Sequence, residues 1–193
     1  MRITFLRHGP TDWNAQGRIQ GHTDIPLSEA GLSKMRGLRP PFTSSRIFAS
    51  PLTRARQTAA ALGLQNPKLD PRLMEQHWGR WEGMTRPEIL AQDGEEAFVR
   101  AGLKLDFRPP GGESTAELHT RVAEFLRDAA RESSDAVAVA HLGVLRAAYT
   151  LATNWEMDAP MPPELDVSKA LVLTLDAEGN PALAALNVEL LTA

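Results

Sequence analysis

The chain has 193 residues, of which 42% are hydrophobic and 23% charged, and its formal net charge at pH 7 is −3. Such a chain fits one globular domain with a real core, and its charge argues against general affinity for nucleic acid or anionic membranes. The absence of cysteine excludes disulfides, thiolate metal ligands and a cysteine nucleophile, and the lack of a signal-peptide pattern or a long apolar run leads us to expect a soluble, cytoplasmic protein.

Short apolar runs alternate with helical patterns in the first half of the chain. We expect buried strands at Ile3–Leu6, Ile47–Ala49 and Leu69–Met74. A polar loop follows the first strand, and Ser28 is then a predicted N-cap for a helix that ends before Arg39–Phe42. Ser50-Pro51 is predicted to open a second helix that continues to about Leu62, with the proline at an early helical position.

The second half begins with the least regular part of the chain, residues 76–112. Within it we expect helices from Pro87 to about Gln92 and around Glu95–Gly102, before a break at Pro109–Gly112. Ser114 and Glu117 then form a capping-box pattern for a helix to about Glu132.

The last third contains the main downstream strand and a predicted hairpin. We expect a strand at Val137–Ala140, a helix at Val144–Ala152, and hairpin strands at Leu171–Leu175 and Leu183–Asn187. Strands that alternate with helices indicate a three-layer α/β/α fold with a mainly parallel central sheet, and the final pair could lie antiparallel at its edge. We therefore predict a single domain over residues 1–193, with a small helical cap inserted at about 76–112.

Polar side chains follow the predicted strands where each strand ends. These residues are Arg7 and His8, then Ser50, Arg54 and Arg56, then Glu75, and finally His141. The carboxyl ends of parallel strands share one edge of a sheet, and ligands bind in the crevice there. The sequence thus predicts two histidines, several arginines and one carboxylate in one crevice.

This set of groups suits phosphoryl transfer. Arginine guanidinium groups offer paired donors to phosphate oxygens, and a neutral histidine has a nucleophilic nitrogen that neighbouring cations help to keep unprotonated. Glu75 could protonate the leaving oxygen. Each residue also has an ordinary interpretation: a histidine at a strand exit can be structural or a metal ligand, Arg54 can cap carbonyls, and Glu75 can be a solvated charge. Because all of these residues follow strands at the same edge, a common phosphoryl-transfer site is favoured over these separate roles.

Several motifs carry a resemblance to a known family. They are Leu6-Arg7-His8-Gly9, Thr11, Trp13-Asn14, Gly17-Arg18, Gln20-Gly21, Asp24, Pro26-Leu27 and Gly31; Ser50–Ala59; Leu73-Met74-Glu75, Gly79 and Trp81-Glu82-Gly83; Gly111–Ser114; and Ala140-His141, Gly143 and Arg146. From residue 3 to about 150 the chain resembles the histidine phosphatase superfamily, in its phosphoglycerate mutase-like branch.

The resemblance implies a role for each matching residue. His8 would attack phosphorus and become a phosphohistidine, and Glu75 would act as general acid and then as general base. The residues implied in phosphate or substrate binding are Arg7, Asn14, Gln20, Arg54, His141 and the backbone N–H of Leu142. No metal and no other cofactor is implied, because the arginines supply the positive charge.

Two positions depart from the family pattern. Pro10 stands where this branch commonly has glutamate, and Leu142 stands where glycine often follows the second histidine. Neither change removes a central group, so we expect activity to survive, with an effect on the shape of the substrate.

The resemblance leaves the reaction open among relatives. The short stretch from Met84 to Pro110 favours a phosphomonoesterase of small phosphorylated metabolites, such as α-ribazole 5′-phosphate, over a cofactor-dependent phosphoglycerate mutase. A protein phosphohistidine phosphatase and a non-catalytic phosphate-binding module are further alternatives. We expect a small phosphorylated metabolite as the partner and neither nucleic acid nor membrane; the two final strands could support a homodimer or simply form an edge.

Overall fold

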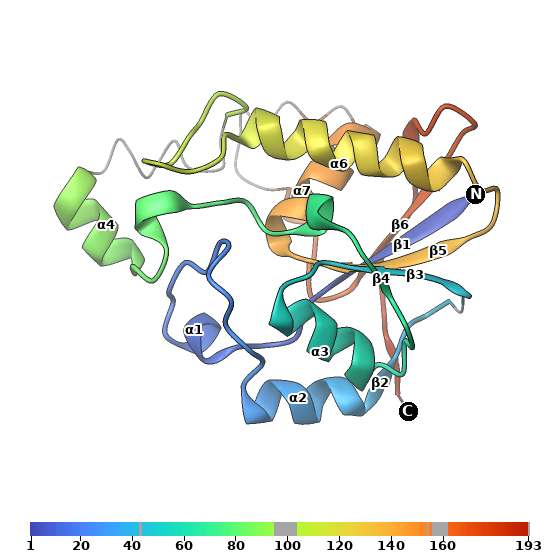
Figure 1. Ribbon diagram of the computed structural model, residues 1–193, viewed down its shortest axis with the longest axis horizontal. Helices are drawn as coiled ribbons and strands as arrows, with labels where there is room; N and C mark the ends of the chain where they lie inside the picture. The colour runs from blue at the N-terminus through green and yellow to red at the C-terminus, as the bar shows by residue number, and fades with distance from the viewer. Residues whose placement is uncertain (43, 95–103, 154, 156–161, 193) are drawn as a thin grey trace.

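In the computed structural model, the described residues are 1–42, 44–94, 104–153, 155 and 162–192. They form a six-stranded sheet with the order β4-β3-β5-β1-β6-β7 (Figure 1). Its strands are β1 (Arg2–Arg7), β3 (Arg46–Ala49), β4 (Lys68–Leu69), β5 (Ala136–Ala140), β6 (Ala170–Leu175) and β7 (Pro181–Val188). The first four strands in that order are parallel, whereas β6 runs antiparallel to both β1 and β7.

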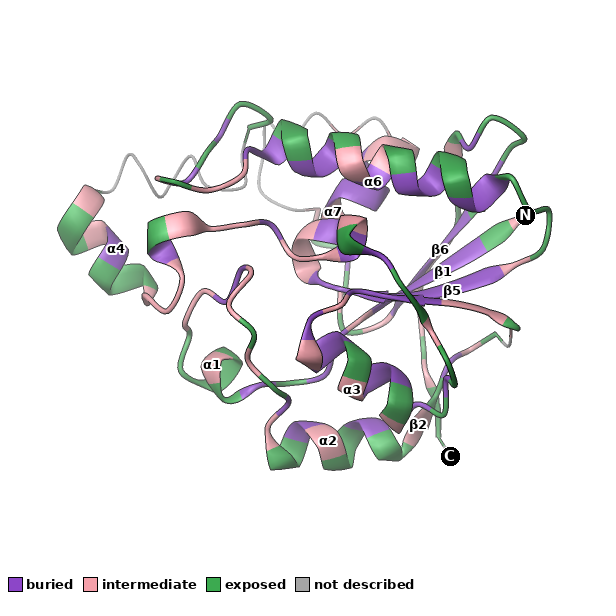
Figure 2. Cartoon of the chain, in the orientation of Figure 1, coloured by how far each residue is buried: buried purple, intermediate pink, exposed green. Residues whose placement is uncertain are grey.

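Helices cover both faces of this sheet (Figure 2). On one face lie α2 (Glu29–Arg36) and α3 (Thr53–Ala61), and on the other lie α6 (Thr115–Ala130) and α7 (Leu142–Thr153). The helices α1 (Asp12–Ala15) and α4 (Arg86–Asp93) lie to the left of the sheet in Figure 1. Successive strand residues point to opposite faces, so Phe5 packs in the cluster with α6 and α7, whereas Leu6 packs in the cluster with α2 and α3. All five residues of β5 are buried, as expected for a parallel strand covered on both sides.

Most predicted elements are confirmed within a residue or two. The Oγ of Ser28 accepts a hydrogen bond from the N–H of Gly31 at the start of α2, and Ser114 with Glu117 forms the predicted capping box of α6. The hairpin is formed by β6 and β7, with β7 at the sheet edge. The described part of the chain contains no helix with the length and apolar character needed to cross a membrane.

Several predictions were wrong in detail. The helix after β3 begins at Thr53, so Pro51 precedes it. The predicted strand Leu69–Met74 is only Lys68–Leu69, because Pro71, which lacks an N–H, begins a 3₁₀ turn to Leu73. The expected helix at Glu95–Gly102 falls largely outside the described residues.

Besides the 3₁₀ turns at Pro71–Leu73 and Gly79–Trp81, three short elements of the described chain were not predicted. They are α1 and the two strands β2 (Leu38–Arg39) and β8 (Leu191–Thr192), which pair with each other. Each has at most four residues, too few for a helical or alternating pattern to show in the sequence.

The segment predicted as a cap has a small apolar cluster of its own. Trp81, Ile89 and Phe107 are buried together, with Trp78 packed beside them. The ring centroids of Trp78 and Trp81 lie 6.2 Å apart. These contacts favour packing as the role of both tryptophans. The boundaries of the cap at 76 and 112 stay a prediction.

Candidate active site

Two neighbouring parallel strands bring the two histidines together. Arg7 on β1 is paired with Ala140 on β5, so His8 and His141 follow at the same sheet edge. The backbone N–H of His8 extends this pairing by donating to the carbonyl of Ala140 at 2.9 Å. The two imidazole ring centroids lie 5.1 Å apart. The structure thus brings together the two residues that the sequence places 133 positions apart (141 − 8).

His8 is held as a neutral imidazole with one free nitrogen. Its Nδ1 lies 2.7 Å from the carbonyl oxygen of Gly9, and because a carbonyl can only accept, Nδ1 carries the proton. Burial, together with the nearby charge of Arg54, lowers the pKa of His8 from 6.5 to about 3. The lone pair on Nε2 is therefore available as a nucleophile at neutral pH.

Helix α3 fixes the loop that carries His8. The backbone N–H of Gly9 donates to Thr58 Oγ1 at 2.9 Å, and Thr58 Oγ1 donates to the carbonyl of Arg54 at 2.7 Å. A Cβ atom on Gly9 would lie only 2.5 Å from Cγ of Met35, so the close approach of α2 requires glycine at this position. The Arg-His-Gly sequence thus combines the candidate nucleophile His8 with a tight packing contact at Gly9.

Arg54 lies at the centre of the site and is fully buried. Its Nη1 and Nη2 donate to the carbonyls of Thr23 and Gly21 at 2.9 and 2.7 Å, and its Nε donates to Nδ1 of His141 at 3.3 Å. These bonds use only part of the donor set of a guanidinium group, so Arg54 retains N–H groups for a ligand. Burial lowers its pKa, and the acidic side chains nearby, with Glu75 foremost, act in the opposite direction.

His141 has both ring nitrogens engaged by the protein. Its Nδ1 accepts from Arg54, so Nε2 carries the proton and donates to Ser50 Oγ at 2.8 Å. The side chain is completely buried, and burial followed by the nearby His8 lowers its pKa well below the ordinary value. A direct contact from His141 to phosphate would require one of these two bonds to be exchanged.

Glu75 faces the first turn of α7. Its Oε1 accepts hydrogen bonds from the N–H groups of Gln76 at 2.8 Å and of Gly143 at 3.0 Å. A Cβ atom on residue 143 would lie 2.3 Å from that oxygen, so a side chain there would displace the Glu75 carboxyl group from this position. Glu75 reaches this position after the turn Pro71–Leu73 and not directly from a strand, contrary to the expectation.

Arg121 on α6 anchors the backbone that leads to Glu75. Its guanidinium donates to the carbonyls of Arg72, Met74 and Glu75 at 2.6, 2.7 and 3.0 Å. The same group pairs with both carboxylate oxygens of Glu113 at 2.6 and 2.8 Å. Arg121 was not among the predicted site residues, because nothing in the sequence around a mid-helix arginine shows that it faces three carbonyls.

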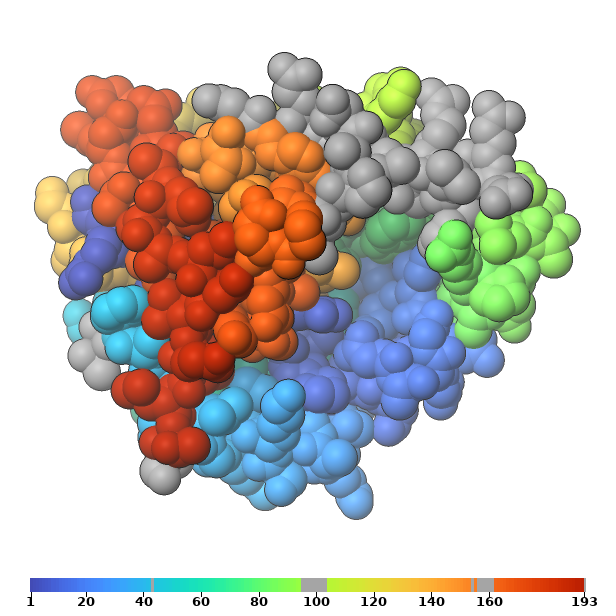
Figure 3. Space-filling view, turned by 180° about the vertical axis from the view of Figure 1, so that it is seen from behind, coloured from blue at the N-terminus to red at the C-terminus, as the bar shows by residue number. Residues whose placement is uncertain are grey.

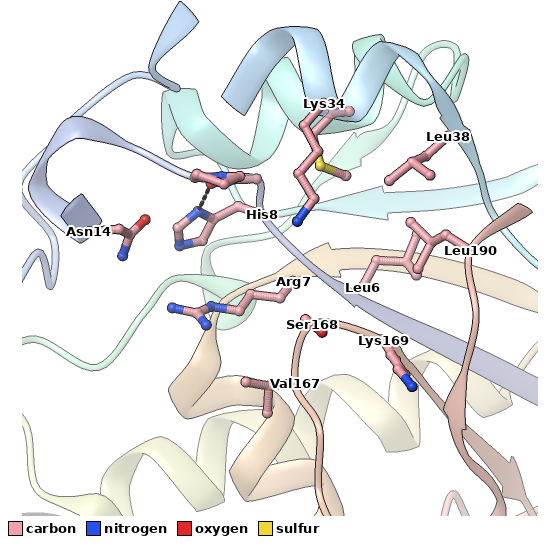
Figure 4. A pocket seen from close by; sticks show the side chains of 13 residues that line it. Leu6, Arg7, His8, Asn14, Lys34, Leu38, Val167, Ser168, Lys169 and Leu190 are labelled. Atoms are coloured by element: carbon pink, nitrogen blue, oxygen red, sulfur yellow. Dashed lines mark hydrogen bonds between the residues drawn. The ribbon is translucent and has the colours of Figure 1, made fainter. Parts of the chain in front are cut away.

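The remaining predicted ligands lie around the same edge. Figure 4 shows Arg7, His8 and Asn14 along one side of a pocket. The Nε of Arg7 is buried without a hydrogen-bond partner, as is Oε1 of Gln20. The Oδ1 of Asn14 accepts from Thr11, which leaves the amide N–H groups of Asn14 for a ligand. These three residues therefore offer unused polar atoms.

Leu142 occupies the first position of α7, where a backbone N–H has no acceptor within the helix. Arg56, in contrast, is exposed on α3 and takes no part in the hydrogen bonds around Arg54 and His141. Ser50 stands directly after β3 and proves to be a partner of His141. Across the described ranges, no three His, Asp or Glu side chains cluster so as to hold a metal ion.

The chain is similar to known proteins in sequence and in fold. The family model described as the histidine phosphatase superfamily (branch 1) matches residues 3–189. A glucosyl-3-phosphoglycerate phosphatase of Mycolicibacterium vanbaalenii is 33% identical over 166 residues, which cover 76% of this chain and 71% of the relative. The solved structure of a mycobacterial glucosyl-3-phosphoglycerate phosphatase complexed with VO3 superposes with a TM-score of 0.82 at 27% identity, covering 97% of this chain and 99% of that one.

A mutase is also among the similar proteins. The 2,3-bisphosphoglycerate-dependent phosphoglycerate mutase 2 of Gloeobacter violaceus is 34% identical over 130 residues, or 62% of this chain. The match spans 58% of the mutase, which is less than two thirds of its length.

Proposed function

The chain belongs to the histidine phosphatase superfamily, branch 1, and we propose that it is a metal-independent phosphomonoesterase of small phosphorylated metabolites. The observation that carries this proposal is the neutral His8, whose free Nε2 lies in a pocket lined by Arg7 and Asn14. The family contains both phosphatases and mutases, which share the first chemical step. We propose that the phosphoryl group is transferred first to His8 and then to water.

In the first step, Nε2 of His8 attacks phosphorus and the bond between phosphorus and the ester oxygen breaks. Glu75 donates a proton to the departing oxygen, so that a neutral alcohol leaves. The bond from Nδ1 of His8 to the Gly9 carbonyl keeps the correct tautomer and stabilises the positive charge that forms on the ring.

In the second step, water attacks the phosphohistidine and the bond between phosphorus and nitrogen breaks. Glu75, now a carboxylate, accepts a proton from that water. Inorganic phosphate is released, and His8 returns to its neutral form. Because Oε1 of Glu75 is fixed by the N–H groups of Gln76 and Gly143, the same carboxyl group can serve both steps without moving far.

The surrounding donors stabilise the charge on the transferred phosphoryl group. We assign this role to Arg7, Arg54, Asn14 and the backbone N–H of Leu142, because donors fixed before the reaction stabilise phosphoryl transition states. Gln20 adds a buried amide next to Gly21, whose carbonyl accepts from Arg54. His141 holds Arg54 in place through the Nε–Nδ1 bond and can contact phosphate only by exchanging one of its bonds.

The short stretch between Gly83 and Gly111 supports hydrolysis over mutase chemistry. A mutase must keep water from its phosphohistidine while the product reorients, and a small cap covers less of the site. The M. vanbaalenii phosphatase is matched over a larger share of its length than the G. violaceus mutase, 71% against 58%. The small cap is the observation that favours release of the phosphoryl group to water.

A panel of phosphomonoesters tests this function. It should contain 3-phosphoglycerate, α-ribazole 5′-phosphate, phosphoserine, nucleotides and sugar phosphates, with phosphate release and isomerisation measured in the same reactions. We expect phosphate release to exceed isomerisation of 3-phosphoglycerate. Isomerisation that greatly outpaces release would show a mutase and overturn the proposal.

A further inference from the structure

The pocket that Arg7, His8 and Asn14 line extends beyond these proposed phosphate ligands. A cavity of about 340 Å³ runs between the end of β1, helix α2, residues 167–169 and Leu190. In Figure 3 the light-blue atoms of α2 lie below the orange and red atoms of the C-terminal part, with dark-blue N-terminal atoms between them. This space is large enough for a small molecule in addition to a phosphate group.

Apart from Arg7, which we assign to the phosphate group, Lys34 is a cation of this cavity without an ion-pair partner among the described residues. Lys34 on α2 makes no hydrogen bond or ion pair with any described residue, and Figure 4 shows its ammonium group directed toward the cavity. Lys169, on the opposite wall, is neutralised: its Nζ lies 2.7 Å from Glu189 and 3.8 Å from Asp166. The cavity therefore has a local excess of positive charge at Lys34.

The rest of the wall around Lys34 is mainly apolar. Met35 and Leu38 contribute from α2 and the segment after it, and Val167 and Leu190 contribute from the C-terminal part. A free inorganic anion would leave this apolar surface uncovered, whereas a ligand with an apolar tail would bury it. The lining thus matches an anionic head group joined to a short hydrocarbon chain.

This cavity differs from the place where the leaving group of a substrate would lie. In-line attack by Nε2 of His8 puts the leaving oxygen on the far side of phosphorus, next to Glu75. Arg7, His8 and Asn14 line one part of the cavity and Lys34, Val167 and Leu190 another, whereas neither Glu75 nor Gly143 lines it. A ligand near Lys34 would therefore occupy a position separate from the reacting ester.

We infer that the cavity binds a small monocarboxylate with an apolar tail, held by an ion pair to Lys34 and bound at the same time as an anion in the phosphate site. This site is additional to the proposed phosphatase activity. It makes the protein responsive to an amphipathic acid that is not its substrate.

Calorimetric titration with hexanoate tests the inference, with and without saturating orthovanadate as a mimic of the transferred phosphoryl group. We expect hexanoate to bind the wild-type protein in both conditions, with affinities that agree within about threefold, and 1-hexanol to bind about tenfold more weakly because it lacks the charge. Complete displacement of hexanoate by orthovanadate would place it in the phosphate site and overturn the inference. So would the absence of hexanoate binding.

Two matched variants identify the cation. Lys34→Met should weaken hexanoate binding about tenfold or more, whereas Lys169→Met, which removes a neutralised lysine from the same cavity, should change it by less than about threefold. Equal effects of the two substitutions would contradict the assignment to Lys34. Orthovanadate binding to the wild-type protein is a separate readout: its loss would count against the phosphatase proposal and leave the hexanoate result intact.

Discussion

The Nε of Arg54 lies 3.3 Å from Nδ1 of His141, and the two residues are 87 positions apart in the sequence. This bond ties the first turn of α3 to the end of β5. It also fixes the ring orientation of His141, whose other nitrogen donates to Ser50. Arg54 is thus both a cation of the proposed phosphate pocket and the residue that organises its neighbours.

Replacing Arg54 with lysine tests this double role. The Arg54→Lys variant keeps a positive charge but cannot reach Thr23, Gly21 and His141 together. We expect kcat/KM for a phosphomonoester to fall by about 10²–10³-fold, the usual cost of losing a fixed donor to a transition-state oxygen. Steady-state kinetics measure the change.

Arg56→Lys is the matched control, because Arg56 is exposed on the same helix. Its kcat/KM should stay within about twofold of wild type. An Arg54→Lys variant as active as this control would show that a positive charge at position 54 suffices. The hydrogen bonds of the guanidinium group would then be unimportant for activity.

The tautomer of His8 can be observed directly. Because burial and Arg54 lower the pKa of His8 to about 3, its ring should remain neutral, with the proton on Nδ1, from pH 7 down to pH 5. Nitrogen-15 NMR of labelled histidine, assigned with His8→Ala, reports both protonation and tautomer. Titration of His8 near pH 6.5 would contradict the buried, cation-flanked environment.

The spacing of apolar residues along the chain, and the residues that follow each strand, made much of the fold predictable. The alternation of short apolar runs with capped helices identifies the parallel sheet, since β1 and β5 read as continuous apolar runs and Ser28 and Ser114 mark helix starts. The shared edge of parallel strands then places His8 and His141 together. The family resemblance added the roles.

Other features of the site depend on contacts that no local pattern encodes. Arg121 faces the carbonyls before Glu75 only because α6 packs against the turn at Pro71–Leu73. Ser50 was visible at a strand exit, but its bond to His141 depends on the neighbouring position of β3 and β5. Such relationships belong to tertiary packing and appear only in the folded chain.

Substitution of Glu75 should reveal its proposed role as proton donor. Glu75→Gln keeps the size of the side chain but cannot protonate a leaving alcohol, so kcat for an alkyl phosphate should fall by about 10²–10⁴-fold. The fall should be much smaller for p-nitrophenyl phosphate, whose leaving group needs little protonation. Equal losses with both substrates would argue against general-acid catalysis, and Glu124→Gln, on an exposed position of α6, is the control.

Arg121 is expected to act by positioning Glu75. Arg121→Met removes the donors to the Met74 and Glu75 carbonyls, so the carboxyl group should lose its alignment with the leaving oxygen. We expect kcat for an alkyl phosphate to fall about tenfold or more, p-nitrophenyl phosphate to be affected less, and Arg121→Lys to restore part of the loss. A purely structural role would reduce both substrates equally.

His119 on α6 should make stability depend on pH. Burial, with a smaller effect of Arg146, lowers its pKa from 6.5 to about 4 in the folded protein. Between these two pH values the unfolded chain binds more protons than the folded protein does. The contribution of neutral His119 to the free energy of unfolding is therefore complete above pH 6.5 and is lost as pH falls toward 4. From pH 7 to pH 5, the free energy of unfolding of wild type should fall by about 2 kcal/mol more than that of His119→Gln. Urea denaturation at both pH values measures this, and parallel losses would refute it.

The central claim is that His8 carries the phosphoryl group, and rapid chemical quench with a phosphorus-32-labelled phosphomonoester tests it most directly. We predict a labelled wild-type protein whose phosphate is lost in acid and retained in base, as expected of phosphohistidine, and no label on His8→Ala, which should also lose turnover. Undiminished turnover by His8→Ala, or label that is stable in acid, would contradict the account.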